Sequence, residues 1–169
     1  MKPVIIINGS GGVGKDTFVE MCSRYVKCTH ISSVDIVKDA ARMLGWNGDK
    51  DEKSRKFLSD IKMLSTNYND SPYEYIMSCI KEFLWSSQLE MLFIDIREPH
   101  EIERVKNNVQ DVYTLLITNP RVSHIFSNDG DAGVNDYAYD YTVLNDGSID
   151  DLYIKAEHFI NWLGQKGTR

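Results

Sequence analysis

A glycine-rich segment with one lysine is the part of the sequence whose residue types and spacing point most directly to chemistry. It reads Gly-Ser-Gly-Gly-Val-Gly-Lys-Asp-Thr and fits the pattern G-x-x-x-x-G-K. Glycines let successive backbone N–H groups point into one concavity, a following helix N-terminus adds positive potential, and the lysine neutralises terminal phosphates. The segment therefore predicts a phosphate-binding loop rather than a glycine-rich turn that happens to contain a lysine. The expected binding positions are Gly9, Gly11, Gly12, Val13, Gly14, Lys15, Asp16 and Thr17.

The residue after Lys15 departs from the usual form of this loop. Asp16 stands where Ser or Thr commonly holds Mg²⁺, and the hydroxyl of Thr17 follows it. Asp16 could contact the ion directly or through water, or Thr17 could take that role. The alternative is that Asp16 only caps the helix that follows.

A second group of charged residues stands at the end of the apolar run 91–96. Asp95, Arg97 and Glu98 are badly placed for a core, and ligands in open parallel sheets bind beyond the carboxyl ends of the strands. We expect Asp95 to orient Mg²⁺ or its water and Arg97 to meet a second phosphate. The alternatives are an ion pair between Asp95 and Arg97, or a helix cap before Pro99.

Charged residues between positions 33 and 88 are candidates for contact with a second substrate. They include Asp35, Arg42, Arg55 and Lys62. Arg55 and Lys62 would share one face of a helix at 51–67, because seven residues are close to two turns. Basic residues on helices are usually solvated, and Asp35, after two serines, could simply belong to a helix start.

The apolar pattern predicts the elements that must position these residues. Short runs rich in β-branched residues predict five buried strands, at 4–8, 29–31, 91–96, 112–117 and 141–144. Apolar residues three and four apart predict helices at 18–26, 73–84 and 149–163, the last with Ser148 as N-cap. This alternation predicts an α/β three-layer sandwich with a five-stranded parallel sheet, the P-loop nucleoside triphosphate hydrolase fold.

The organisation of the chain predicts one domain over residues 1–169, since we find no repeat and no linker. Two segments are longer than ordinary connections. Residues 33–88 have the pattern of three helices, an insert between the second and third strands. Residues 120–140 contain two glycines and many Asp and Asn residues and predict a flexible, lid-like loop.

Composition excludes several classes of protein. The formal charge of −6 has the wrong sign for binding a nucleic-acid polymer, and no run of residues approaches a membrane span. Three cysteines without a CxxC spacing indicate neither a disulfide framework nor a zinc site, so we expect a cytoplasmic protein. The four histidines show no metal spacing and are expected to be structural or surface residues.

The order of strand, phosphate loop, helical insert, Asp-x-Arg and late loop resembles that of the P-loop kinases of the nucleoside and nucleotide monophosphate kinase group, adenylate kinase included. The resemblance covers nearly the whole chain. Gly14-Lys15-Asp16 is most similar to small kinases whose loop reads Gly-Lys-Asp, such as phage-type deoxynucleoside monophosphate kinases and phosphomevalonate kinase. The resemblance implies ATP and Mg²⁺ as cofactors, Lys15 on the ATP phosphates, and Asp95 with Arg97 beside the acceptor. It also implies that the insert binds the acceptor.

The expected lid has few cations. Adenylate kinase relatives bring several arginines to the transferred group, whereas Arg121 is the one permanent cation from 120 to 140, among four aspartates. Phosphoryl transfer consists mostly of alignment and charge stabilisation, so Lys15, Arg97 and Arg121 are the catalytic candidates.

The leading hypothesis is transfer of the γ-phosphoryl group of ATP to a small phosphorylated acceptor, a nucleoside or deoxynucleoside monophosphate. One alternative is a nucleotide-binding regulatory protein without efficient transfer, which the arginine-poor lid permits. Another is a kinase of a non-nucleotide metabolite, because no motif in the insert reads a base. A GTPase is disfavoured, since Thr118-Asn119-Pro120-Arg121 lacks the Asp of a guanine-reading element.

Overall fold

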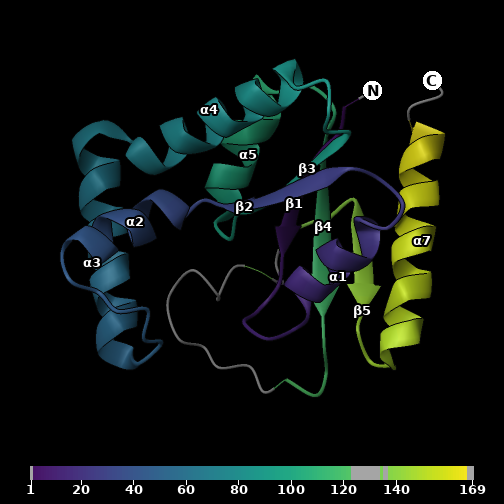
Figure 1. Ribbon diagram of the computed structural model, residues 1–169, viewed down its shortest axis with the longest axis horizontal. Coiled ribbons are helices and arrows are strands. Elements are labelled where there is room, and N and C mark those ends of the chain that lie inside the picture. Colours follow the sequence, from purple (N-terminus) through teal and green to yellow (C-terminus); the bar gives the residue numbers. More distant parts are fainter. Residues whose placement is uncertain (1, 123–133, 135–136, 167–169) are drawn as a thin grey trace.

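The computed structural model describes residues 2–122, 134 and 137–166 (Figure 1). Strands and helices follow one another along the chain, with three consecutive helices between the second and third strands. In order they are β1 (Val4–Asn8), α1 (Lys15–Cys22), β2 (Cys28–Ser32), α2 (Asp35–Met43), α3 (Glu52–Asn69), α4 (Ser71–Trp85), β3 (Met91–Asp95), α5 (Pro99–Asn108), β4 (Val112–Thr118), β5 (Tyr141–Leu144) and α7 (Ile149–Lys166).

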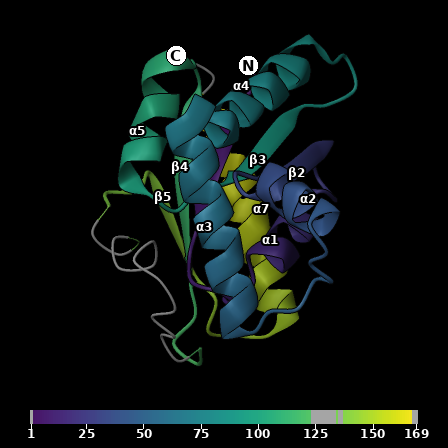
Figure 2. The ribbon, with the colours of Figure 1, turned by 90° about the vertical axis from the view of Figure 1, so that its left-hand side faces the viewer.

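The five strands form one sheet in the order β2-β3-β1-β4-β5, and every neighbouring pair is parallel. The central strand β1 is buried along its whole length, as its unbroken apolar sequence predicts. Helices cover both faces of the sheet (Figures 1 and 2). The expected three-layer α/β sandwich with a P-loop after the first strand is therefore confirmed.

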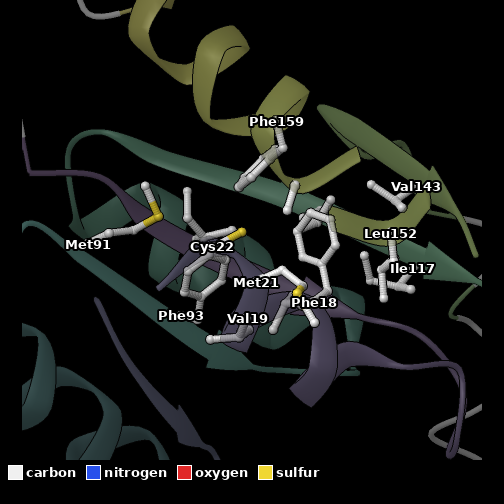
Figure 3. Close-up of a cluster of buried hydrophobic side chains, with 14 of the residues drawn as sticks. Phe18, Val19, Met21, Cys22, Met91, Phe93, Ile117, Val143, Leu152 and Phe159 are labelled. Carbon is white, nitrogen blue, oxygen red and sulfur yellow. The ribbon is translucent and has the colours of Figure 1, made fainter. Parts of the chain in front are cut away.

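Alternate residues of β1 face the two helical layers, because successive side chains of a strand point to opposite faces. Ile5 and Ile7 belong to a core shared with α1 and α7, where Phe18 and Phe159 lie with ring centroids 5.8 Å apart (Figure 3). Val4 and Ile6 belong to a second core, with α4 and α5. These two cores fix the sheet between its helices.

Three helices lie between β2 and β3, as the sequence predicts. α2, α3 and α4 contact one another, and they extend to one side of the sheet (Figure 1). α3 begins at the N-cap Asp51, whose carboxylate accepts a hydrogen bond from the backbone N–H of Ser54 at 2.7 Å. It forms much of the side of the molecule that faces the viewer in Figure 2.

One expected boundary differs from the structure, and one expected segment cannot be compared with it. The first helix ends at Cys22, so Tyr25 and Val26 lie outside it, although both donate backbone hydrogen bonds to the carbonyl of Cys22. The chain has to turn here to enter β2, and Val26 still packs on the core. The expected lid falls largely on residues 123–133 and 135–136, which are outside the described residues.

Ser148 caps the last helix as predicted. Its hydroxyl accepts a hydrogen bond from the backbone N–H of Asp151 at 3.2 Å, and Asp151 accepts one from the N–H of Ser148 at 2.7 Å. This reciprocal pair fixes the start of α7. Among the described residues, no helix combines the length and the apolar composition needed to span a membrane.

Candidate phosphate-binding site

The phosphate loop joins the end of β1 to the start of α1. Gly9, Gly12 and Gly14 adopt φ values of 142°, 82° and 100°, in the region that favours glycine. Gly14 is also the N-cap of α1. A Cβ atom at Gly9 would collide with the carbonyl oxygen of Ile117, so the loop can lie against β4 only with glycine at that position.

Lys15 lies over this loop. Its ammonium donates hydrogen bonds to the carbonyl oxygens of Gly9 at 2.7 Å and Ser10 at 3.3 Å. The cation and the N-terminus of α1 therefore stand at one place, where they attract an anion.

The chain between β5 and α7 supports the loop from the other side. Asn145 donates a hydrogen bond from Nδ2 to the carbonyl oxygen of Val13 at 2.8 Å. A Cβ atom at Gly14 would lie 2.5 Å from the same Nδ2. Nothing in the sequence indicates the role of Asn145, because 132 residues separate it from Val13 and leave no local signal.

The side chain of Arg121 contacts the same connection between β5 and α7. Its guanidinium donates a hydrogen bond to the carbonyl oxygen of Asp146 at 2.5 Å, and its backbone N–H donates to the side chain of Asn119. The structure thus places this predicted catalytic residue at the β5–α7 connection.

The carboxyl ends of β1, β2 and β3 meet at one edge of the sheet. Asp95 is in register with Ile7 of β1 and Ser32 of β2, so its side chain lies beside the phosphate loop. One of its carboxylate oxygens accepts a hydrogen bond from His30 Nε2 at 3.0 Å. The other, Oδ1, is buried and has no hydrogen-bond partner among the described residues.

His30 also lies close to Asp16, in the first turn of α1. Its Nδ1 atom lies 3.7 Å from Oδ1 of Asp16, whose side chain is 94% exposed. The histidines were expected to be structural or surface residues, and the structure places His30 beside two carboxylates at the phosphate loop. The spacing of His30 in the sequence gave no metal signal. The order of the strands in the sheet, and not the interval along the sequence, brings His30 close to Asp16 and Asp95.

The surroundings of His30 act on its pKa in both directions. Burial lowers the pKa, whereas the hydrogen bond to Asp95 and the charges of Asp95, Asp16 and Asp35 raise it. The sum is a pKa above the ordinary value of a histidine. The site therefore concentrates negative charge around one imidazole ring.

A buried asparagine ties the loop to Arg97. Asn8, at 1% exposure, donates hydrogen bonds from Nδ2 to the carbonyl oxygen of Arg97 at 3.2 Å and to the hydroxyl of Tyr139 at 2.8 Å. Its Oδ1 accepts from the N–H of Gly9 at 2.8 Å. Asn8 thus links the first residue of the loop, the second residue after β3 and the segment before β5.

Two of the predicted acceptor residues serve local structure. Asp35 accepts hydrogen bonds from the N–H of Ser32 at 2.7 Å and from the ammonium of Lys38 at 3.1 Å, at the start of α2. Arg42 forms an exposed ion pair with Asp39 at 2.6 Å. Thr17 is half-buried on α1, and Arg55 is exposed on α3.

Lys62 differs from these residues because its side chain is only 17% exposed. Its ammonium lies 2.7 Å from Glu98, directly after Arg97, and 3.2 Å from Glu101. Burial and the charge of Glu98 raise the pKa of Glu101 to about 7, against the opposite effect of Lys62. For Glu98, burial works against ionisation, but Lys62 lowers its pKa. The ammonium of Lys62 therefore forms ion pairs with both Glu98 and Glu101.

A cavity of about 250 Å³ adjoins the phosphate loop on the β4 side. Its walls come from Gly9, Ser10 and Val13 of the loop, from the end of β4, and from Leu144. The loop and this cavity form one continuous site on the carboxyl edge of the sheet.

Comparisons with known proteins give a distant structural likeness. No family model matches the chain. No curated protein matches it either. Among solved structures, the chain is similar to a shikimate kinase from Aquifex aeolicus, with 12% sequence identity and a TM-score of 0.48, over 98% of this chain and 99% of that chain. Since this likeness is too low to carry an argument, the fold follows from the strand order and the functional proposal from the site.

Proposed function

We propose that the chain is an ATP-dependent kinase, a transferase that moves the γ-phosphoryl group of ATP to a small phosphorylated acceptor. The observation that carries this proposal is the position of Lys15 and the three positive-φ glycines beside Asp95, at the carboxyl edge of a parallel sheet. Phosphoryl transfer needs a cradle for the donor phosphates and charges around the transferred group. The loop supplies the first, and Asp95 with Arg97 is proposed to supply part of the second.

The cavity beside the loop supports a nucleotide as the donor. A nucleoside triphosphate has a planar aromatic base as well as its phosphates, and the cavity adjoins the loop's own residues. We propose that backbone N–H groups of the loop and Lys15 hold the phosphates, with the base toward the cavity.

The residues present fit a magnesium ion. Oδ1 of Asp95 is a buried carboxylate oxygen without a hydrogen-bond partner, and such an atom is well suited to an ion or its bound water. Asp16 and Thr17 are close along α1 and are the other proposed ligands. When bound, Mg²⁺ neutralises charge on the phosphate oxygens.

The acceptor is proposed to lie on the side of Arg97, toward the helices α2, α3 and α4. Asn8 fixes the backbone at Arg97. Glu98 follows Arg97 and forms an ion pair with Lys62, which also contacts Glu101. A nucleoside or deoxynucleoside monophosphate brings one phosphate for an arginine and hydrogen-bonding groups for the polar cluster. This acceptor class rests on the sequence resemblance, and Arg121 is retained as the third catalytic candidate.

Two other functions share the same site. A non-nucleotide phosphorylated metabolite would use Arg97 in the same way, and a nucleotide-binding regulator would use the loop without efficient transfer. The arginine-poor sequence from 120 to 140 favours keeping the regulator as a candidate.

The test is the rate of ADP formation from Mg²⁺ and ATP with each ribonucleoside and deoxyribonucleoside monophosphate in turn. We expect one acceptor or a small group to raise the rate, and Lys15→Ala to remove this rise. If ATP stabilises the wild type but no acceptor speeds turnover, the nucleotide kinase is excluded. A regulator or a kinase of another metabolite then remains, and screening phosphorylated metabolites separates these two.

A further inference from the structure

An imidazole ring stands between two carboxylates at the mouth of the phosphate loop. Asp16, His30 and Asp95 come from α1, β2 and β3, and one potential ligand atom from each lies within 4.8 Å of the other two. Imidazole nitrogen and carboxylate oxygen are both common ligands of divalent ions. Among the described residues, these three side chains form such a group.

The two ring nitrogens of His30 have different neighbours. Nε2 lies at hydrogen-bond distance, 3.0 Å, from Asp95, whereas Nδ1 lies 3.7 Å from Asp16, which is too far for a hydrogen bond. In the neutral ring, Asp95 therefore fixes the proton on Nε2. The lone pair of Nδ1 is then directed toward Asp16.

This arrangement is the usual one around a metal-bound histidine. Such a histidine donates its other N–H to a carboxylate, which sets the tautomer and the ring orientation. Two ligand atoms that each lie about 2.1 Å from one ion stand about 3 to 3.6 Å apart for ordinary coordination angles. The observed 3.7 Å between His30 Nδ1 and Asp16 Oδ1 is close to that range.

We propose that His30 and Asp16 can bind a divalent first-row transition-metal ion at the phosphate loop in place of the Mg²⁺ proposed above, with Oδ2 of Asp95 positioning the imidazole ring. An imidazole ligand favours such ions over Mg²⁺, which prefers oxygen ligands alone. The His30 side chain is 21% exposed and Asp16 is 94% exposed, so an ion here keeps positions open to water or phosphate oxygens. The inference rests on the proposed function only in that these open positions would receive the phosphates of the nucleotide.

The closing experiment measures Mn²⁺ binding to the full chain without nucleotide, by electron paramagnetic resonance at about pH 8, above the ordinary pKa of a histidine. We expect one bound ion that an equal concentration of Mg²⁺ does not displace. Pulsed measurements should show coupling to a directly bound imidazole ¹⁴N nucleus.

Three variants assign the ligands. His30→Gln should weaken Mn²⁺ binding more than about tenfold and remove the ¹⁴N coupling, and Asp16→Asn should weaken binding similarly. Asp95→Ala should weaken it by about 10- to 100-fold, the usual effect of removing a supporting partner. His158→Gln, which changes an exposed histidine of α7, is the matched control and should bind as the wild type does.

The proposal is overturned if His30→Gln binds Mn²⁺ as tightly as the wild type, if the nitrogen coupling is missing, or if the wild type binds no ion at millimolar concentration. Melting temperatures of the variants show that each one is folded. Lys15→Ala separates the two proposals, because it should lose ATP binding and keep Mn²⁺ binding. Failure of the kinase assay thus leaves the metal test intact, and the reverse also holds.

Discussion

At the scale of single residues, the phosphate loop depends on backbone conformations that only glycine adopts without strain. Gly14 has a φ of 100°, and a Cβ atom there would lie 2.5 Å from the amide nitrogen of Asn145. Gly11 has no atom within 4 Å of its Cβ position and no positive φ. Two glycines of one loop are therefore under different constraints.

Gly14→Ala should destabilise the protein by about 1 to 3 kcal/mol, the cost of a left-handed conformation for a residue with a Cβ atom. Gly11→Ala is the matched control and should change the free energy of unfolding by less than about 0.5 kcal/mol. Urea unfolding of the two variants measures the difference. Equal stability of both would contradict the constraint at Gly14.

The cluster of Lys62, Glu98 and Glu101 gives a pH-dependent prediction. In the folded protein the pKa of Glu101 is raised from its ordinary 4.5 to about 7. The unfolded chain therefore releases this proton first, and the stability that the protonated group contributes is present below pH 4.5 and lost as the pH rises through about 7. Glu101→Gln cannot ionise and does not lose this contribution.

The melting temperature of Glu101→Gln relative to the wild type should rise as the pH increases from 4.5 to about 7. Glu20→Gln, at an exposed position of α1, provides the baseline. A difference between Glu101→Gln and the wild type that stays constant over this range would show that the pKa of Glu101 is not raised in the folded protein.

At the scale of elements, α4 connects the helical insert to the sheet through a buried apolar face. Ile80 is 2% exposed and belongs to the core that includes Val4 and Ile6 of β1. Trp85, near the end of the same helix, is 84% exposed. One helix thus contains a residue that holds the insert in place and a larger residue that does not.

Ile80→Ala should cost about 2 to 5 kcal/mol of stability, because it removes buried methyl groups and leaves a cavity. Trp85→Ala should change stability by less than about 0.5 kcal/mol, although it removes more atoms. Thermal unfolding compares the two. A larger loss from Trp85→Ala would mean that the exposed indole is covered by something else.

At the scale of the whole molecule, the proposed site links nucleotide binding to folding stability. A ligand that binds only the folded state stabilises it by about 2.7 kcal/mol at 100 times its dissociation constant. For a chain of this size, ATP should then raise the melting temperature by about 5 to 10 °C. Lys15→Ala should remove the shift.

Polyanions provide the comparison for this shift. The formal charge of the chain is −6, so its overall field repels a nucleic-acid polymer even though one loop attracts phosphates. Duplex DNA at the same phosphate concentration should leave the melting temperature unchanged at moderate salt. A shift as large as that with ATP would show that the loop does not discriminate a nucleotide from a polymer.

The sequence by itself determined the five strands and the phosphate loop, because each of them is encoded in one local stretch of the chain. Five apolar runs are the five strands, and the glycines with Lys15 lie in one stretch between β1 and α1. The predicted end of the first helix, at position 26, was wrong. The turn after Cys22 depends on where β2 must start, and not on the spacing of the apolar residues. The roles of the site residues remain predictions.

Only the tertiary structure decided which distant side chains meet. His30 lies 65 residues from Asp95 in sequence, and Asn145 lies 132 residues from Val13, yet each pair is in hydrogen-bond contact. The strand order places β2 beside β3 and β5 beside β4, so Asn145, directly after β5, reaches the loop. Such contacts depend on long-range packing between elements, which no local spacing in the sequence specifies.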